Sequence, residues 1–241
     1  MILQTPTNND NINIAGEFES IQAGIDESSL PFILEMLSKN FYSNPIGSIC
    51  REYTSNCFDS HIEAKIDEPV IIKIDEDEEG EYISFKDVGA GLSPDRIKNI
   101  FMKYFTSTKR DSNEMIGAMG LGSKSALAYQ DYFYIITIFD NIKYTYLYSK
   151  GISLPTLDLL NEESTTEHNG TEIKIYIKNS SDKYNFIKEL KSQLCYFDNV
   201  YFIGCGIDNE YRIYENDLFK YKNKDQYSDE MHISFGRNLF N

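Results

Sequence analysis

The spacing of hydrophobic residues changes along the chain, and these changes predict a mixed order of strands and helices. Apolar residues at every second position are typical of strands with one buried face, and the alternation is strictest at Ile173, Ile175 and Ile177. Polar turns separate several such runs and predict two hairpins, the second turned at Asp140 and Asn141. The predicted strands of the central region are residues 70–74, 82–86, 132–140, 143–148 and 171–178.

Other segments carry the spacing or the start signals of helices. Asn44 is a capping residue and Pro45 suits the first helical position, so a helix is predicted from residue 44 to about residue 65. Ser93 and Pro94 give the same signal for a helix to about residue 104. Further predicted elements are helices at 30–39, 122–129 and 183–196 and strands at 18–25 and 232–235.

The helix that begins at residue 44 carries three polar side chains on one side. Glu52, Asn56 and Asp59 are spaced i, i+4 and i+7, which at about 100° per residue places them on one face. A carboxylate can act as a base, and an amide oxygen can bind a metal ion. The alternative is an ordinary amphipathic helix whose polar face is solvated, while Cys50 and Tyr53 enter the core.

A second candidate site follows a predicted strand at Asp87, Gly89 and Gly91. Glycines let the backbone approach a ligand closely or adopt a positive φ angle. An Asp carboxylate there can accept a hydrogen bond from an exocyclic amine, such as that of adenine. The alternative is an Asx turn between flexible glycines.

Residues 117–125 form a glycine-rich segment ahead of a predicted helix, and its amides can surround an anion. A P-loop is excluded because Ser123 stands where that motif needs Lys and no buried strand precedes the segment. A dinucleotide fingerprint is excluded because Ser125 replaces its third glycine. Any phosphate would therefore be held in another way.

Two weaker signals involve hydroxyl side chains. Thr108 and Lys109 belong to a cluster of hydroxyls and cations at residues 106–110, and Gly170 and Thr171 open a predicted strand. Either hydroxyl could reach a ligand. Alone, the first is more typical of a solvated loop than of a binding segment, and the second indicates no more than an ordinary strand start.

Composition narrows the function classes. The chain of 241 residues has a formal net charge of −15, which argues against non-specific nucleic-acid binding and against binding to an anionic membrane surface. A nucleotide stays open, because backbone amides and a few cations are enough to hold phosphate. The four cysteines form no CxxC pair and indicate free thiols in a reducing cytosol, and the three scattered histidines predict no zinc site. No apolar run approaches the length of a membrane span.

Taken together, the order and spacing of these motifs resemble the GHKL ATPases, which include gyrase B, heat-shock-90 chaperones, histidine kinases and MutL. The motifs are Glu-x-x-x-Asn-x-x-Asp, Asp-x-Gly-x-Gly, Thr-Ser-Thr-Lys, Gly-x-x-Gly-x-Gly and Gly-Thr, within residues 16–205. Within this group, residues 42–46, 51–61 and 120–129 are similar to the phage rIIA-like proteins, protectors from prophage-induced early lysis. The resemblance implies the Bergerat fold, an α+β two-layer sandwich of a mixed, mostly antiparallel sheet with helices on one face.

The resemblance also implies a role for each motif. Glu52 would be the general base, Asn56 would coordinate Mg²⁺, Asp59 would support the pocket, and Asp87 would accept from the adenine amino group. Val88 departs from the pattern, since Asn or Thr is frequent at its position. The other implied nucleotide-binding residues are Gly89, Gly91, Thr108, Lys109, Gly117, Gly120, Gly122, Ser123, Lys124 and Thr171.

The activity implied is binding and slow hydrolysis of Mg-ATP, with lid closure and transient homodimerisation as a conformational switch. A protein kinase of the same fold and a non-hydrolysing ATP-binding module that engages a protein partner are the alternatives. We expect a loose lead-in at residues 1–15, an ATPase domain at 16–215 and the start of a truncated transducer-like domain at 216–241. The expected location is the cytoplasm, of the host cell if the protein is phage-encoded.

Overall fold

The computed structural model describes residues 43–102, 122–151, 154–194 and 197–207, together with residues 29 and 32 and four short strands between residues 213 and 240. The predicted lead-in at 1–15, the predicted strand at 18–25 and nearly all of the predicted helix at 30–39 lie outside the described residues.

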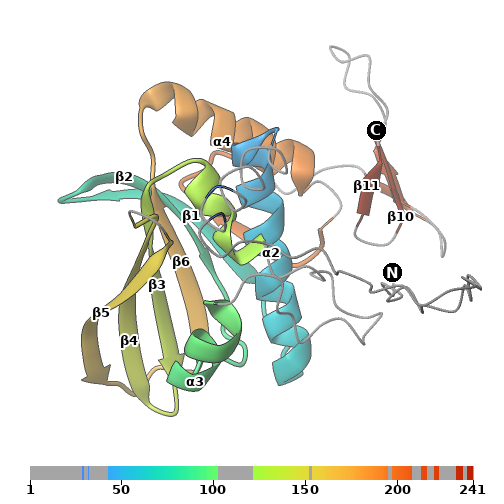
Figure 1. Ribbon diagram of the computed structural model, residues 1–241. Coiled ribbons are helices and arrows are strands. Elements are labelled where there is room, and N and C mark those ends of the chain that lie inside the picture. The colour runs from blue at the N-terminus through green and yellow to red at the C-terminus, as the bar shows by residue number, and fades with distance from the viewer. Residues whose placement is uncertain are drawn as a thin grey trace, which may run out of the picture.

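A seven-stranded sheet forms one layer of the molecule (Figure 1). Its strand order is β5-β4-β3-β6-β2-β1-β7, and all neighbours are antiparallel except β1 and β7, which are parallel. The strands are β1 (Val70–Asp77), β2 (Gly80–Lys86), β3 (Tyr132–Phe139), β4 (Ile142–Ser149), β5 (Thr156–Ser164), β6 (Gly170–Tyr176) and β7 (Val200–Ile203). The predicted mixed, mostly antiparallel sheet is confirmed.

Both predicted hairpins are present, and turn chemistry explains the second. β3 and β4 are joined by Asp140 and Asn141, whose φ angles are 53° and 63°. Two consecutive left-handed residues are typical of a type I′ turn, whose twist matches that of antiparallel strands, and Asp and Asn tolerate this conformation. In the first hairpin, β1 and β2 pair as far as Asp77 opposite Gly80.

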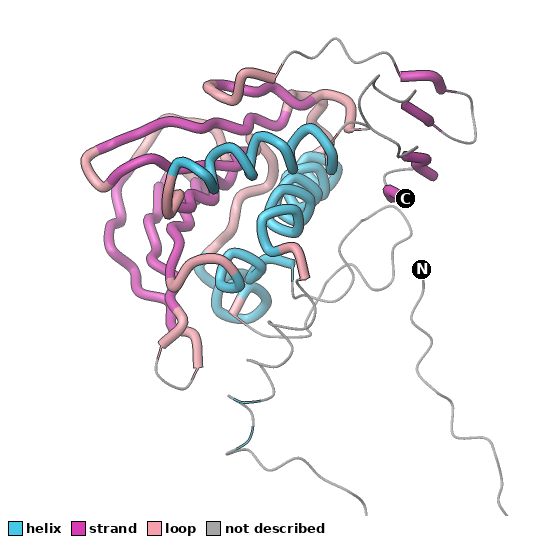
Figure 2. Tube along the Cα trace, turned by 90° about the horizontal axis from the view of Figure 1, so that it is seen from above, coloured by secondary structure: helices cyan, strands magenta, loops and turns pink. Residues whose placement is uncertain are grey.

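The helices lie together on one face of the sheet, which Figure 2 shows as a separate layer from above. This confirms the predicted α+β two-layer sandwich. The helical elements are α2 (Pro45–Ala64), α3 (Pro94–Arg96), the π-helical turn η2 (Ile97–Phe101), the 3₁₀ helix η3 (Gly122–Ala128) and α4 (Ser180–Gln193).

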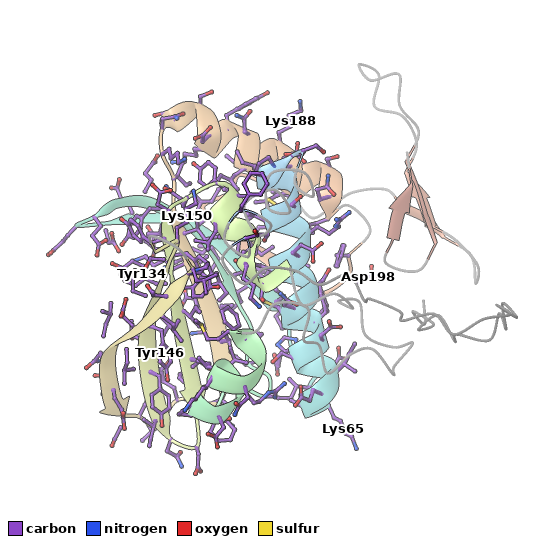
Figure 3. All side chains as sticks on the ribbon, in the orientation of Figure 1. Lys65, Tyr134, Tyr146, Lys150, Lys188 and Asp198 are labelled. Carbon is purple, nitrogen blue, oxygen red and sulfur yellow. The ribbon has the colours of Figure 1, made fainter. Side chains whose placement is uncertain are left out.

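Helix α2 begins and ends where the sequence predicts. The amide of Gly47 donates a 3.0 Å hydrogen bond to Oδ1 of Asn44, Pro45 takes the first helical position, and Lys65 ends the helix with a φ angle of 56°. A left-handed residue is a common helix stop. Figure 3 shows Lys65 at the end of α2 that lies farther from α4, on which Lys188 is labelled.

The core fills the space between the two layers. Ile135 of β3 and Tyr146 of β4 are paired, and both belong to one buried cluster with Ile49 and Tyr53 of α2. Because side chains alternate along a strand, Tyr134 lies on the other face of the sheet (Figure 3).

Some elements differ from the sequence prediction. No strand was expected at β5 or β7, because β5 is an edge strand exposed along most of its length and β7 has only four residues. Neither therefore needs a clear apolar period. Helix α4 begins at Ser180 rather than at residue 183, because the side chain of Asn179 caps it by accepting a 3.0 Å hydrogen bond from the amide of Asp182.

A second, four-stranded sheet has the order β11-β10-β9-β8. Its strands are β8 (Ile213–Glu215), β9 (Lys220–Lys222), β10 (His232–Phe235) and β11 (Asn238–Phe240), so the strand predicted at 232–235 is confirmed. The domain boundaries proposed from the sequence stay predictions. Among the described helices, none is both long and apolar enough to cross a membrane.

Candidate functional site

The polar face of helix α2 is graded from exposed to buried. The side chain of Glu52 is 27% exposed and pairs at 3.3 Å with Arg51, a surface contact that contributes little stability. Asn56 is half-buried, and Asp59 is only 2% exposed. A solvated face would not bury a carboxylate, so the ordinary amphipathic helix is not the arrangement observed.

The last glycine of the glycine-rich segment lies against Glu52. A Cβ atom placed on Gly122 would come within 2.2 Å of Oε2 of Glu52, a distance at which one group would have to move. The structure therefore brings together a predicted base and a predicted phosphate-binding glycine that are 70 residues apart in the chain. Thr108, Lys109, Gly117 and Gly120 lie outside the described residues.

Tyr53 attaches the start of η3 to helix α2. Its hydroxyl donates a 3.0 Å hydrogen bond to the backbone carbonyl of Ser123 and accepts one of 3.3 Å from the amide of Ala126. The sequence assigned Tyr53 to the core, and it is indeed buried, but its polar contact was missed. The only signal in the sequence is that Tyr53 directly follows Glu52.

Lys124 lies in η3 and packs against η2. Its ammonium donates to Oγ of Ser123 at 3.0 Å and stands 5.2 Å from the centre of the Phe101 ring. The side chain is buried, and burial lowers the pKa of Lys124 to about 8. Lys124 and Ser123 thus lie next to the part of α2 that carries Glu52 and Tyr53.

Asp87 lies in the loop after β2 and is almost completely buried. Its Oδ1 accepts hydrogen bonds from the amide of Gly89 at 2.8 Å and from the hydroxyl of Ser60 at 2.9 Å. Burial raises the pKa of Asp87 to about 6, although these hydrogen bonds act in the opposite direction. The other carboxylate oxygen, Oδ2, takes part in neither of these two bonds.

Two residues at the end of helix α2 hold this loop, and the sequence reasoning missed both as functional residues. Besides its bond to Asp87, Oγ of Ser60 accepts a 3.0 Å hydrogen bond from the amide of Ala90. Nε2 of His61 accepts a 3.1 Å bond from the amide of Val88. The signal that could have found them is position, since Ser60 lies one helical turn beyond Asn56.

The predicted Gly-Thr pair joins the same loop from strand β6. The amide of Asp87 donates a 2.9 Å hydrogen bond to the carbonyl of Thr171. Gly170 has a φ angle of 159°, and a Cβ there would lie 2.2 Å from the carbonyl oxygen of Asp87. Glycine is therefore required at this crossing.

Thr137 of β3 is a further residue that the sequence reasoning missed. Its buried hydroxyl accepts a 2.8 Å bond from the amide of Leu92, lies 3.1 Å from the carbonyl of Gly170, to which it donates, and stands 3.2 Å from the hydroxyl of Thr171. Gly91, with a φ angle of 69°, passes so close to the carbonyl of Ile138 that a Cβ would be 2.2 Å from it. Strand β3 thus contacts the loop after Asp87 through Thr137 and Ile138.

The residues present suit a purine nucleotide with a magnesium ion. The buried carboxylate of Asp87 uses Oδ1 for its hydrogen bonds with Ser60 and Gly89, and Oδ2, which takes part in neither, is the kind of acceptor that an exocyclic amine needs. Asn56 and Glu52 supply oxygen atoms of the kind that Mg²⁺ prefers. A magnesium ion needs few protein ligands when substrate phosphates provide the others.

Comparisons with known proteins identify the fold. A scan against protein-family models gives no match, and no curated protein matches in sequence. The structure is similar to the ATPase region of Saccharomyces cerevisiae topoisomerase II, solved bound to ICRF-187 (dexrazoxane), with a TM-score of 0.54 and 15% sequence identity. The match covers 74% of this chain and 58% of that chain, so the present chain spans little more than half of the topoisomerase structure. Helices over one face of the seven-stranded sheet, together with this match, establish the Bergerat fold of the GHKL ATPases.

Proposed function

We propose that this chain binds Mg-ATP and slowly hydrolyses it to ADP and phosphate. The observation that carries the proposal is the contact between Gly122 and the carboxylate of Glu52, on the same helix whose C-terminal end holds the Asp87 loop. One rigid helix therefore connects a candidate base at the end of a glycine-rich segment with a candidate adenine acceptor. The fold match to an ATPase region supports the same class of activity.

The proposed adenine side of the pocket consists of Asp87 and Thr171. Oδ2 of Asp87 accepts a hydrogen bond from the adenine amino group, and the hydroxyl of Thr171 contacts the base, directly or through water. Gly89 and Gly91 let the backbone pass beside the base, while Asp59 supports the pocket from helix α2. A guanine base presents a carbonyl at the position of the amine, so the buried carboxylate rejects it.

The proposed phosphate side lies along the middle of helix α2, at Glu52 and Asn56. Glu52 orients the attacking water and removes its proton, a task that needs a carboxylate within one water of the γ-phosphorus. Asn56 holds Mg²⁺, which neutralises charge on the phosphate oxygens. The phosphate-binding segment is completed by Thr108, Lys109, Gly117, Gly120, Gly122, Ser123 and Lys124.

Closure of the segment that contains these glycines and transient homodimerisation on ATP binding are part of the proposal, with ATP acting as a conformational switch. The similarity to phage rIIA-like proteins rests on the sequence motifs, and a role in an infected host cell is proposed on that basis alone. The cysteines, which form no CxxC pair and indicate free thiols, support a cytoplasmic location. A protein partner beyond a second copy of the chain is left open.

The test is the substitution Glu52→Ala, measured as ATP binding by calorimetry and as release of inorganic phosphate. Removal of a general base is expected to lower phosphate release by about 10²- to 10⁴-fold and to leave ATP affinity within a few fold of wild type. Glu63→Ala is the matched control, because Glu63 is an exposed carboxylate of the same helix that pairs with Arg96. Unchanged turnover in Glu52→Ala would reject the assigned base.

The same assay separates the alternatives. A wild-type protein that transfers phosphate to protein, with no free phosphate, is a kinase. A wild-type protein that binds ATP and returns it intact is a binding module.

A further inference from the structure

We infer that Ser60 and His61 are positioning residues that set adenine specificity by fixing the Asp87 loop before a nucleotide binds. The inference rests on the proposed function, because it concerns the same pocket. Both lie within the similar segment 51–61, but neither belongs to the five spaced motifs that imply the nucleotide-binding roles. Both lie beyond Asp59, in the last turn and a half of helix α2.

Ser60 fixes the direction in which the Asp87 carboxylate points. Its hydroxyl donates to Oδ1 at 2.9 Å, and the amide of Gly89 donates to the same oxygen at 2.8 Å. Two donors on one oxygen hold the carboxylate plane and turn Oδ2 away from both. The single Oγ also accepts from the amide of Ala90 at 3.0 Å, so one side chain holds the carboxylate and the backbone that follows it.

The close approach of Gly89 supports this role. A Cβ on Gly89 would stand 2.4 Å from Oγ of Ser60 and 2.6 Å from the carbonyl oxygen of Ser60. The loop and the helix are therefore in direct contact at this point, with no room for a side chain between them. Glycine is needed there for the contact with the helix, whatever its distance from a ligand.

His61 holds the next peptide of the loop. Its Nε2 accepts from the amide of Val88 at 3.1 Å, so the imidazole is neutral and carries its proton on Nδ1. Burial lowers the pKa of His61, which favours the neutral form, while the carboxylate and backbone of Glu68 act in the opposite direction. The imidazole is buried, which means that loss of this acceptor would leave the Val88 amide without its partner.

The arrangement makes the pocket selective because the Asp87 carboxylate and its loop cannot rearrange to fit a different base. A carboxylate free to rotate could turn away from a 6-oxopurine, and a loop free to shift could present an amide to its carbonyl. With the Asp87 carboxylate and the Val88 and Ala90 amides all tied to helix α2, a guanine base would face an acceptor with no donor to offer it.

The experiment compares Ser60→Ala with Ser55→Ala. Ser55 is a buried serine of the same helix whose Oγ has no hydrogen-bond partner within the described structure, so it controls for loss of a buried hydroxyl. Calorimetry with ATP and GTP is expected to show about tenfold weaker ATP binding and a smaller ATP-to-GTP ratio for Ser60→Ala only. The kcat for ATP should stay within about twofold while KM rises.

His61 is tested by a pair of variants. His61→Ala removes the acceptor and should lower the ATP-to-GTP ratio, whereas His61→Gln places an amide oxygen near the position of Nε2 and should restore it. A purely structural role would lower the unfolding free energy without changing the ratio, and such a result would overturn the inference for His61.

A readout without nucleotide separates this inference from the proposed function. The Ser60 hydroxyl lowers the pKa of Asp87, so Ser60→Ala should raise that pKa above its wild-type value in a carboxyl titration followed by NMR. If wild type binds no adenine nucleotide, the proposed function and the specificity role both fail. If wild type prefers ATP and Ser60→Ala keeps both the preference and the Asp87 titration, only the inference fails.

Discussion

The C-terminal end and the middle of helix α2 meet their neighbours in different ways. At the C-terminal end, Ser60 and His61 make side-chain hydrogen bonds of 2.9, 3.0 and 3.1 Å to the loop that carries Asp87. At the middle of the helix, Glu52 remains partly exposed, and its contact with Gly122 is one of proximity rather than a hydrogen bond. There the attachment is made by the neighbouring residue, Tyr53.

In the proposed function, this difference corresponds to a division between adenine recognition and hydrolysis. A specificity site gains from being fixed in advance, because ordering it during binding would cost affinity. A hydrolytic site that closes over its substrate needs a base that can adjust as the phosphates arrive. Helix α2 connects the proposed specificity site with the proposed hydrolytic site, and substitutions in each region should affect only one of the two roles.

The largest effect on ATP affinity is expected at the fixed end, from Asp87→Asn. The amide oxygen can replace Oδ1 toward Ser60 and Gly89, but the amide nitrogen then presents donors to the donor of adenine. ATP affinity should fall by about 100-fold, and the preference for ATP over GTP should vanish in calorimetry. Undiminished ATP affinity would reject the contact and, with it, the description of this end as the recognition site.

The same substitution has a pH signature. The pKa of Asp87 is raised by burial to about 6 in the folded protein from an ordinary 3.8, so the folded state binds the proton more tightly than the unfolded state. Stability from this group is complete below the ordinary value and is lost as the pH rises through about 6, by about 3 kcal/mol for a shift of about two units.

Chemical unfolding near pH 4 and near pH 8 measures this loss. Asp87→Asn should flatten the pH dependence, whereas Asp158→Asn, on the exposed strand β5, should leave it unchanged. If the pH dependence of Asp87→Asn equals that of wild type, the carboxyl does not titrate in this range.

The limits of helix α2 and its polar face were readable from the sequence. Spacing alone placed Glu52, Asn56 and Asp59 on one side of a helix, because a helix repeats regularly and its caps at Asn44 and Pro45 are local signals. The hairpin turned at Asp140 was equally local. Such features depend on residues a few positions apart, and so a single sequence reveals them.

The contacts that fix the Asp87 loop were not readable in the same way. Ser60 and Thr137 contact the loop across 27 and 45 residues of sequence. No pattern in a single sequence indicates which distant residue a serine or threonine hydroxyl will bind. The hydroxyl of Tyr53 reaches Ser123 across 70 residues, yet an aromatic residue in an amphipathic helix looks like any core residue. Edge strand β5 was missed because exposure on both faces removes the alternation that identifies a strand.

An intermediate effect is expected from Tyr53→Phe. The substitution keeps the ring in the core and leaves the Ser123 carbonyl and the Ala126 amide without their partner. Loss of a buried hydrogen-bond partner should lower the unfolding free energy by about 1–3 kcal/mol in urea. Tyr184→Phe, at a residue 69% exposed on α4, is the control and should change little.

The turnover of Tyr53→Phe tests whether hydrolysis can change without a change in adenine specificity. If Tyr53 fixes the segment after Gly122 relative to Glu52, kcat should fall while the ATP-to-GTP ratio stays unchanged, because the recognition end keeps all its contacts. A change in the ATP-to-GTP ratio would mean that hydrolysis and adenine specificity do not depend on separate regions of helix α2.

The smallest effect is expected from Gly122→Ala, which directly tests the contact between Gly122 and Glu52. The new methyl group would lie 2.2 Å from Oε2 of Glu52, and because the carboxylate is the far end of a flexible side chain it can move aside at little cost in stability. We expect about a tenfold loss in kcat with unchanged ATP affinity, since only the position of the base is altered. The double variant Glu52→Ala/Gly122→Ala should be no slower than Glu52→Ala alone, because the methyl group then has no carboxylate to displace. Additive losses would show that Gly122 acts on the nucleotide independently of Glu52, and the contact on which the proposed function depends would then be incidental.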